Sequence, residues 1–281
     1  MLNTSPKTLC VGTMLKFGTP DFEEYMKFMA SAGMECCQFC RISETLMVGG
    51  PANSESAKLL DQLEQYGIPP VSIFLGYGKS SGGNGLVSAE LRAERFSYAF
   101  RQMLWGGRLG IKYISCHAGK FPEIGTREFD DFAKDMKSFV QFAADLGEDF
   151  LFETGPDSME EMQAMLDAID EMNVGINFDP ANLLLYNQTD PALFAERLFP
   201  KIRLIHCKDG KRPREGQKLG DQTPLGEGDT HFVTLIRKMI DKGFRGPLIL
   251  ERETLHDENH FSDQKKAVNL LKQLRANTID P

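Results

Sequence analysis

Short apolar segments alternate with longer amphipathic segments along the whole chain. Eight strands are predicted where β-branched, aromatic and other apolar residues gather, at 9–15, 35–41, 70–75, 111–117, 149–153, 174–179, 202–207 and 247–252. Eight helices are predicted between them, at 21–32, 54–66, 88–105, 127–146, 158–172, 190–198, 230–242 and 261–275. Continuous apolar runs such as Leu248-Ile249-Leu250 are typical of parallel strands covered on both faces.

Several of the predicted helices carry their own start and stop signals. Asp21 with Glu24, and Ser158 with Glu161, have the spacing of a capping box. Gly33 follows the first predicted helix and can end it in the left-handed conformation. These signals place helix boundaries independently of the hydrophobic pattern.

The strict alternation of strands and helices indicates βαβ units and a parallel sheet. Eight units in 281 residues fit a closed (β/α)8 barrel, a fold of roughly 250 residues. No linker interrupts the pattern, so we expect one domain over 1–281. The alternative fold is an open doubly wound sheet with a second lobe. The glycine-rich stretches 76–85 and 216–228 each follow a predicted strand and are expected to be active-site loops.

The composition excludes several classes of protein. With 41% hydrophobic and 26% charged residues, the chain is typical of a globular protein. Its net charge of −8 disfavours a nucleic-acid partner. It has no apolar run long enough to span a membrane and no signal-peptide pattern at the N-terminus. Six cysteines are too few for a disulfide framework, so we expect reduced thiols and a cytoplasmic location.

Four consecutive predicted strands carry an ionisable side chain at their last residue or next to it, and these are Glu153, Asp179, His206 and Glu251. The C-terminal ends of barrel strands carry the active site, so these side chains would meet at one point. Three carboxylates in one pocket repel each other, and a divalent cation removes this conflict. Three oxygens and one nitrogen suit Mn²⁺, Mg²⁺, Co²⁺ or Zn²⁺. We expect one such ion here, although each residue could instead be solvated or ion-paired.

The sequence around these residues resembles the xylose-isomerase-like TIM-barrel superfamily. The matching motifs are Phe152-Glu153-Thr154, Asn177-Phe178-Asp179-Pro180-Ala181-Asn182, His206-Cys207-Lys208-Asp209, Leu225-Gly226-Glu227-Gly228-Asp229 and Gly246-Pro247-Leu248-Ile249-Leu250-Glu251. That superfamily holds sugar-phosphate isomerases and epimerases, ketose 3-epimerases, inosose dehydratases and the endonuclease IV group. The resemblance implies that Glu153, Asp179, His206 and Glu251 are the metal ligands.

The ketose 3-epimerase branch implies a reaction as well. Its substrate is a keto-sugar or related polyol, and its catalytic pair matches Glu153 and Glu251. One carboxylate removes the proton next to a metal-bound carbonyl, which gives an enediolate, and the other returns a proton on the opposite face. By this resemblance the chain is a metal-dependent sugar isomerase or epimerase of carbohydrate metabolism.

Four further residues are predicted to bind substrate. Arg212 stands where ketose epimerases place a substrate-contacting arginine, and Asn182 stands where they have histidine. Asparagine can bond a hydroxyl group but cannot shuttle protons. His117 ends the fourth predicted strand and can contact substrate oxygens. Lys208 either binds substrate or pairs with Asp209.

Two other patterns bear on cofactors and on the second strand. No Gly-x-Gly-x-x-Gly follows the first predicted strand, so neither a nicotinamide nor a flavin is expected. Cys37 and Cys40 have the spacing of a redox pair but lie inside a predicted strand, where a reactive thiol is not expected. Gln38, between them, occupies a position where many relatives carry glutamate.

Three other functions stay open. A dehydratase acting on an inosose or dehydroshikimate type of substrate would use the same proton removal and then expel a hydroxyl group. An abasic-site endonuclease is disfavoured, because the related nucleases gather three zinc ions with many histidines and this chain has five. A non-catalytic sugar-binding barrel would bind without turnover. Loops 76–86, 118–127 and 208–229 are expected to select the sugar, phosphorylated or not, and such barrels often form homo-oligomers.

Overall fold

The predicted strands close into a parallel barrel. The computed structural model describes residues 4–16, 22–40, 42–49, 53–77, 85–252 and 259–279. The barrel strands are β1 (Val11–Lys16), β2 (Cys36–Cys40), β3 (Pro70–Phe74), β4 (Tyr113–Cys116), β5 (Asp149–Glu153), β6 (Val174–Phe178), β7 (Ile202–Cys207) and β10 (Leu248–Leu250). They pair in chain order, and β10 closes the barrel against β1 with Leu248 opposite Val11. The (β/α)8 prediction is confirmed, and the open doubly wound alternative is wrong.

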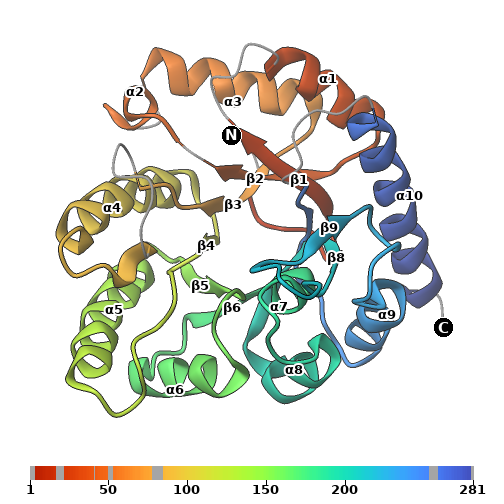
Figure 1. Cartoon of the computed structure of the whole chain (residues 1–281). Helices are drawn as coiled ribbons and strands as arrows, with labels where there is room; N and C mark the ends of the chain where they lie inside the picture. The colour runs from red at the N-terminus through yellow and green to blue at the C-terminus, as the bar shows by residue number, and fades with distance from the viewer. Residues whose placement is uncertain are drawn as a thin grey trace.

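Helices surround the barrel on all sides (Figure 1). The long ones are α1 (Phe22–Ser31), α3 (Ser54–Tyr66), α4 (Arg92–Leu109), α5 (Arg127–Asp145), α6 (Met159–Ile169), α8 (Pro191–Leu198), α9 (Phe232–Asp241) and α10 (His260–Ile279). All eight overlap the predicted segments, although α4 begins and ends four residues later than the predicted 88–105. Its C-terminal half continues through Gly106, where a Cβ atom would lie 2.6 Å from Ile73 Cδ1, and stops at the left-handed Gly110.

Two short helices and two short strands were not predicted. Helix α2 (Glu44–Met47) and helix α7 (Pro180–Leu185) are too short to show a helical period. Strands β8 (Asp209–Lys211) and β9 (Asp221–Thr223) form an antiparallel hairpin inside the segment expected to be a loop. Both α7 and the hairpin lie at the C-terminal ends of the barrel strands, next to the residues predicted to bind metal.

The capping residues predicted from the sequence are found at several helix ends. The capping box at Ser158 is present: its Oγ accepts from the Glu161 N–H at 3.2 Å, and its own N–H donates to Glu161 Oε2 at 2.7 Å. Gly33 has φ 73°, in the left-handed region expected after the first helix. Asp21, the first residue of the other predicted capping box, lies outside the described residues.

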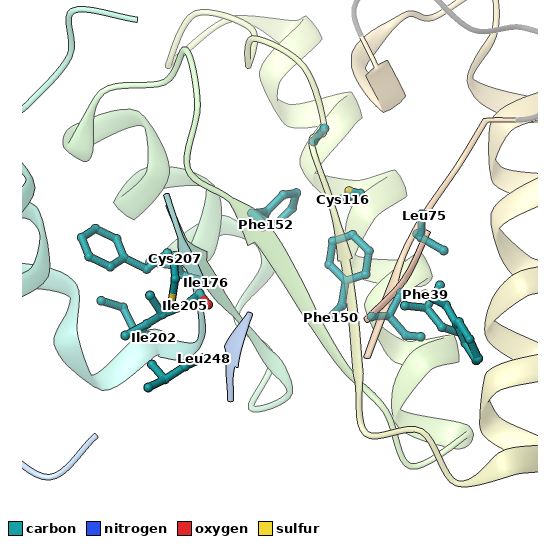
Figure 2. Packing of buried hydrophobic residues seen from close by; sticks show 14 of the residues in the cluster. Phe39, Leu75, Cys116, Phe150, Phe152, Ile176, Ile202, Ile205, Cys207 and Leu248 are labelled. Atoms are coloured by element: carbon teal, nitrogen blue, oxygen red, sulfur yellow. Dashed lines mark hydrogen bonds between the residues drawn. The ribbon is translucent and has the colours of Figure 1, made fainter. Parts of the chain in front are cut away.

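The hydrophobic core has two parts, one on each side of the sheet. The larger part lies between strands and helices, where Figure 2 shows Phe150 and Phe152 of β5 and Ile205 and Cys207 of β7. The smaller part fills the barrel interior and consists of Cys10, Cys36, Val71, Leu151, Leu204 and Ile249. Alternate residues of a strand face opposite sides, so the residues two positions after Leu151, Leu204 and Ile249 also face the interior, one layer nearer the C-terminal ends.

All six cysteines are buried and free, in keeping with the expectation of reduced thiols. Among the described helices, none combines the length and the apolar character needed to cross a bilayer.

Candidate metal centre

Four side chains converge at the C-terminal end of the barrel. Glu153 is the last residue of β5, Asp179 follows β6, His206 is the penultimate residue of β7, and Glu251 follows β10. Each offers one ligand atom, and these atoms all lie within 4.8 Å of one another. His206 Nδ1 lies 2.6 Å from Glu153 Oε1 and 2.8 Å from Glu251 Oε2. The structure therefore brings together the four residues predicted as ligands.

The backbone around Asp179 is fixed by a reciprocal pair of hydrogen bonds. Thr154 Oγ1 accepts from the Asp179 N–H and donates to the Asp179 carbonyl, both at 2.7 Å. Asp179 is also the N-cap of α7, because its Oδ1 accepts from the Asn182 N–H at 3.0 Å. Its other oxygen, Oδ2, accepts no hydrogen bond from the described residues. Oδ1 therefore caps helix α7, and Oδ2 is the oxygen available to bind a cation.

Burial strongly perturbs the ionisation of these groups. It raises the pKa of Glu153 to about 8, with a further contribution from the nearby Glu251 carboxylate. It also raises the pKa of Asp179 to about 6, against the opposing effect of Lys208. Burial alone would lower the pKa of His206, but the Glu251 and Glu153 carboxylates outweigh it and raise that pKa to about 10. Without a metal, Glu153 and His206 therefore keep protons at neutral pH, which reduces the crowded negative charge.

The donor set fits one divalent cation. No two of the ligand atoms lie more than 4.8 Å apart, which is close to twice a metal–oxygen distance of about 2.1 Å. Carboxylate oxygens with one imidazole nitrogen suit Mg²⁺, Mn²⁺, Co²⁺ and Zn²⁺. A cation would replace the protons that the raised pKa values indicate, because a bound cation favours ionised ligands.

Lys208 supplies a buried positive charge beside the centre. Its side chain is 1% exposed, and its Nζ lies 3.5 Å from Asp179 Oδ2 and 3.8 Å from Glu251 Oε2. It also donates to Asn182 Oδ1 at 3.1 Å. The alternative of a pair with Asp209 is not favoured, because the Asp209 carboxylate accepts hydrogen bonds from Thr230 and from the N–H groups of the following turn. Lys208 is instead the counter-charge of two candidate ligands.

The other predicted substrate contacts lie at different places. Asn182 is in α7 next to the centre, where its Nδ2 donates to the Thr154 carbonyl at 3.0 Å. His117 follows β4, and its Nε2 would lie 2.6 Å from a Cβ atom on Gly155, so only glycine fits there. Arg212 donates to Asn187 Oδ1 and to the Gln188 carbonyl, both at 3.0 Å, which ties the β8–β9 hairpin to the segment after α7.

A pocket lies beside the centre, between the hairpin and the start of α10. Its polar lining includes Lys208, Gln222, Glu251, Arg252 and Gln264. Gln222 of β9 donates to the Glu251 carbonyl at 3.3 Å, and the Arg252 guanidinium is paired with Asp263. The unpredicted hairpin therefore forms one wall of this pocket and holds the backbone of a candidate ligand.

Two residues in contact with His206 were not predicted to have a role. Gln38 Oε1 of β2 lies 2.8 Å from His206 Nε2, and Asn177 Nδ2 of β6 lies 2.9 Å from the same nitrogen. Both side chains are fully buried. The signal for Asn177 is its spacing, since a strand residue two positions before Asp179 faces the same interior. Gln38 was noted in the sequence only because many relatives carry glutamate at its position, which assigned it no role.

The closed barrel and the strand-end group of three carboxylates and one histidine define a (β/α)8 protein with a candidate metal centre. The chain belongs to the family described as xylose isomerase-like TIM barrel, whose model matches residues 26–274.

Several known proteins are similar to this chain. The protein MJ1311 of Methanocaldococcus jannaschii is 22% identical over 162 residues, which is 53% of each chain, so the match spans about half of that relative. A xylose isomerase domain protein from Planctomyces limnophilus has a TM-score of 0.87 and 24% identity, covering 98% of this chain and 100% of that one.

Two structural neighbours carry names that refer to reactions. A D-tagatose 3-epimerase-like protein has a TM-score of 0.73 and 16% identity, covering 96% of this chain and 99% of that one. AsbF of Bacillus anthracis, a probable 3-DHS dehydratase, has a TM-score of 0.70 and 16% identity, covering 93% of this chain and 98% of that one. At these identities the likeness shows the shared fold.

Proposed function

We propose that this chain is a divalent-metal-dependent isomerase or epimerase that acts on a keto-sugar or related polyol. The main observation in support is that two carboxylates lie beside the same imidazole nitrogen, His206 Nδ1. Glu153 and Glu251 both lie within 2.8 Å of His206 Nδ1, although they come from strands β5 and β10 on either side of β7. The family membership and the epimerase-like neighbour support the same reading.

The proposed metal site consists of Glu153, Asp179, His206 and Glu251. When bound, a divalent cation supplies a Lewis acid that polarises a substrate carbonyl and lowers the pKa of the adjacent C–H group. The proposed catalytic residues are Glu153 and Glu251. One carboxylate accepts the proton when the C–H bond breaks, and the other gives a proton to the opposite face of the same carbon when the new bond forms. The chain thereby inverts or moves a stereocentre without a redox cofactor.

The surroundings of the pair suit proton transfer. Glu153 is 6% exposed, and the side chain of Glu251 is 10% exposed and lines the pocket. A water-poor site strengthens the attraction between the ligands and the cation and protects an enediolate from side reactions. In the proposed arrangement Asn182 and Lys208 orient substrate oxygens beside Glu251, while His117 and Arg212 contribute contacts further along the substrate.

A dehydratase is the second candidate, and the position of Lys208 favours it. Loss of water needs an acid that protonates the departing hydroxyl group. The Lys208 ammonium lies 3.8 Å from Glu251 Oε2, at the wall of the pocket, and carries the required proton. Proton abstraction from carbon is common to both candidates, and they differ in the fate of the intermediate.

Product analysis separates the two candidates. The metal-loaded protein is incubated with ketohexoses, ketopentoses, inososes and their phosphates, and the products are analysed by mass spectrometry and NMR. An isomerase or epimerase gives a product of unchanged mass, whereas a dehydratase gives a product that has lost one water. Turnover that persists at full rate after removal of the metal with EDTA would contradict both.

A further inference from the structure

A layer of buried polar side chains lies inside the barrel, directly below the candidate ligands. Gln38 of β2, Ser72 of β3, Ser115 of β4 and Asn177 of β6 are all fully buried. Burying an amide or a hydroxyl group costs free energy unless it is hydrogen-bonded, so the hydrogen-bond partners of these side chains indicate their role. Two of the four, Gln38 and Asn177, contact the ring nitrogen of His206 that faces away from the carboxylates.

The two amides offer opposite partners to His206 Nε2. Gln38 presents its Oε1, an acceptor, at 2.8 Å, and Asn177 presents its Nδ2, a donor, at 2.9 Å. The ring that binds a cation is the neutral imidazole, which has one donor nitrogen and one acceptor nitrogen. His206 Nε2 can therefore donate to Gln38 or accept from Asn177, but it cannot do both at the same time.

The choice at Nε2 decides what Nδ1 can do. If Nε2 carries the hydrogen and donates it to Gln38, Nδ1 has a free lone pair and can bind a metal. If Nε2 accepts from Asn177, the hydrogen is on Nδ1, where it bonds to Glu153 and blocks coordination. Asn177 has a second partner, Ser115 Oγ at 2.9 Å, so its amide stays bonded in either case.

We propose that Gln38 is a positioning residue that fixes His206 in the Nε2–H tautomer, which leaves Nδ1 available for the divalent cation. This rests on the metal centre of the proposed function. The amide nitrogen of Gln38 has no hydrogen-bond partner among the described residues, so the side chain is held through its oxygen, which bonds to His206. Because a buried amide is costly, we attribute the presence of Gln38 at this position to its hydrogen bond with His206. Phe74 packs against the same ring, with centroids 5.7 Å apart, and supports its orientation.

Metal affinity in matched variants tests this inference. Gln38→Leu removes the acceptor, and Gln38→Glu keeps an acceptor at the same position. Ser72→Ala is the control, because Ser72 is equally buried and is the register neighbour of Gln38. Co²⁺ and Zn²⁺ affinities are measured by competition with a chromophoric chelator. We expect Gln38→Leu to bind about 10- to 100-fold more weakly, the usual effect of losing such a partner. Gln38→Glu should bind as tightly as the wild type, and Ser72→Ala should stay within about twofold.

A spectroscopic measurement on the wild type needs no substitution. In the zinc-loaded protein, ¹⁵N NMR of the histidine rings is expected to show His206 with a hydrogen on Nε2 and none on Nδ1. Gln38→Leu should also change the visible absorption of the Co²⁺ form, because the ligand ring is no longer fixed.

The outcomes separate this inference from the proposed function. A wild type that binds metal, with Gln38→Leu equal to it in affinity and Co²⁺ spectrum, overturns the role of Gln38 and leaves the metal centre intact. A bare Nε2 in the zinc form overturns it as well, even if Gln38→Leu fails to fold. A wild type that binds no divalent cation overturns the metal centre and, with it, the role of Gln38.

Discussion

His206 Nδ1 lies 2.6 Å from Glu153 Oε1, although the two residues are 53 positions apart in the chain. They belong to β7 and β5, which do not pair with each other but both pair with β6. They come into contact because the sheet curves into a barrel and both side chains face its interior. A substitution at the end of one of these strands is therefore expected to change the environment of the ionisable groups at the ends of the others.

Asp179→Asn tests the metal centre without removing a catalytic carboxylate. The substitution keeps the size of the side chain but removes one of three negative charges from the centre, so we expect metal affinity to fall by at least 100-fold, about 3 kcal/mol at 1.4 kcal/mol for each tenfold change. Isothermal titration with Mn²⁺ measures this. Glu227→Gln, which alters an exposed carboxylate after the hairpin, is the control and should bind as the wild type does. Equal affinity in Asp179→Asn and the control would contradict the centre.

Lys208→Met removes the buried counter-charge of Asp179 and Glu251. Breaking a buried ion pair commonly costs about 3–5 kcal/mol, so we expect the metal-free variant to unfold several degrees below the wild type. A divalent cation restores the missing positive charge, and the gain in Tm on adding metal should therefore be larger for the variant. Thermal unfolding with EDTA and with excess Mn²⁺ measures both values. Lys211→Met, at an exposed position of the hairpin, is the control. The same gain in all three proteins would argue against this role.

Glu148, which lies outside the candidate metal centre, makes the free energy of unfolding depend on pH. It immediately precedes β5, is 1% exposed, and neither of its carboxylate oxygens accepts a hydrogen bond from the described residues. Burial raises its pKa from an ordinary 4.5 to about 9. The folded chain therefore keeps a proton that the unfolded chain releases, and this contribution to stability is lost as the pH rises from about 4.5 to about 9.

Glu148→Gln should flatten that dependence. Between pH 5 and pH 8 in EDTA, we expect the free energy of unfolding of the variant to fall by a few kcal/mol less than that of the wild type. Urea unfolding at both pH values measures the difference, and other buried acids, such as Asp157, are common to both proteins and cancel. Parallel pH profiles would show that Glu148 does not carry the proton.

Asp209 fastens the turn that follows the hairpin. Its Oδ2 accepts from the N–H groups of Gly226 and Gly228 at 2.9 and 3.1 Å, and its Oδ1 accepts from the Thr230 hydroxyl at 2.7 Å. Asp209→Asn places an amide nitrogen against some of these donors, which typically costs about 1–3 kcal/mol. We expect faster amide hydrogen exchange over 225–230, with Asp229→Asn as the exposed control. Unchanged exchange would mean that other contacts hold the turn.

The fold could be predicted from the sequence because its signals are local and repeated. Each barrel strand is a short apolar run, and each long helix has a polar and an apolar face, so the eight βα units stand out. The predicted end of α4 at residue 105 was wrong, because the helix continues through Gly106. In the barrel its missing side chain lets the helix approach Ile73, and the helix continues to Gly110.

The candidate ligands could be predicted because they share one position in four successive units. Their surroundings could not. Gln38 reaches His206 across the barrel interior, a contact made by closure of the sheet and absent from any local pattern. Strands β8 and β9 have three residues each, too few for an alternating signal, yet they form the wall of the pocket. The ion pairs of Lys208 with Asp179 and Glu251 likewise depend on the position of α7 and β10 in space.

Deuterium incorporation from D2O shows directly whether the metal-loaded protein removes a proton from carbon. The metal-loaded protein is incubated with the panel of ketoses and inososes, and exchange at the carbon next to the carbonyl is followed by NMR. We expect exchange that stops in EDTA, falls by at least about 100-fold in Glu153→Gln and Glu251→Gln, and persists in Glu227→Gln, since general acid–base catalysis contributes about 100- to 10,000-fold. Full exchange in Glu251→Gln, or a metal-loaded protein that binds a sugar of the panel without exchanging its C–H, would contradict it.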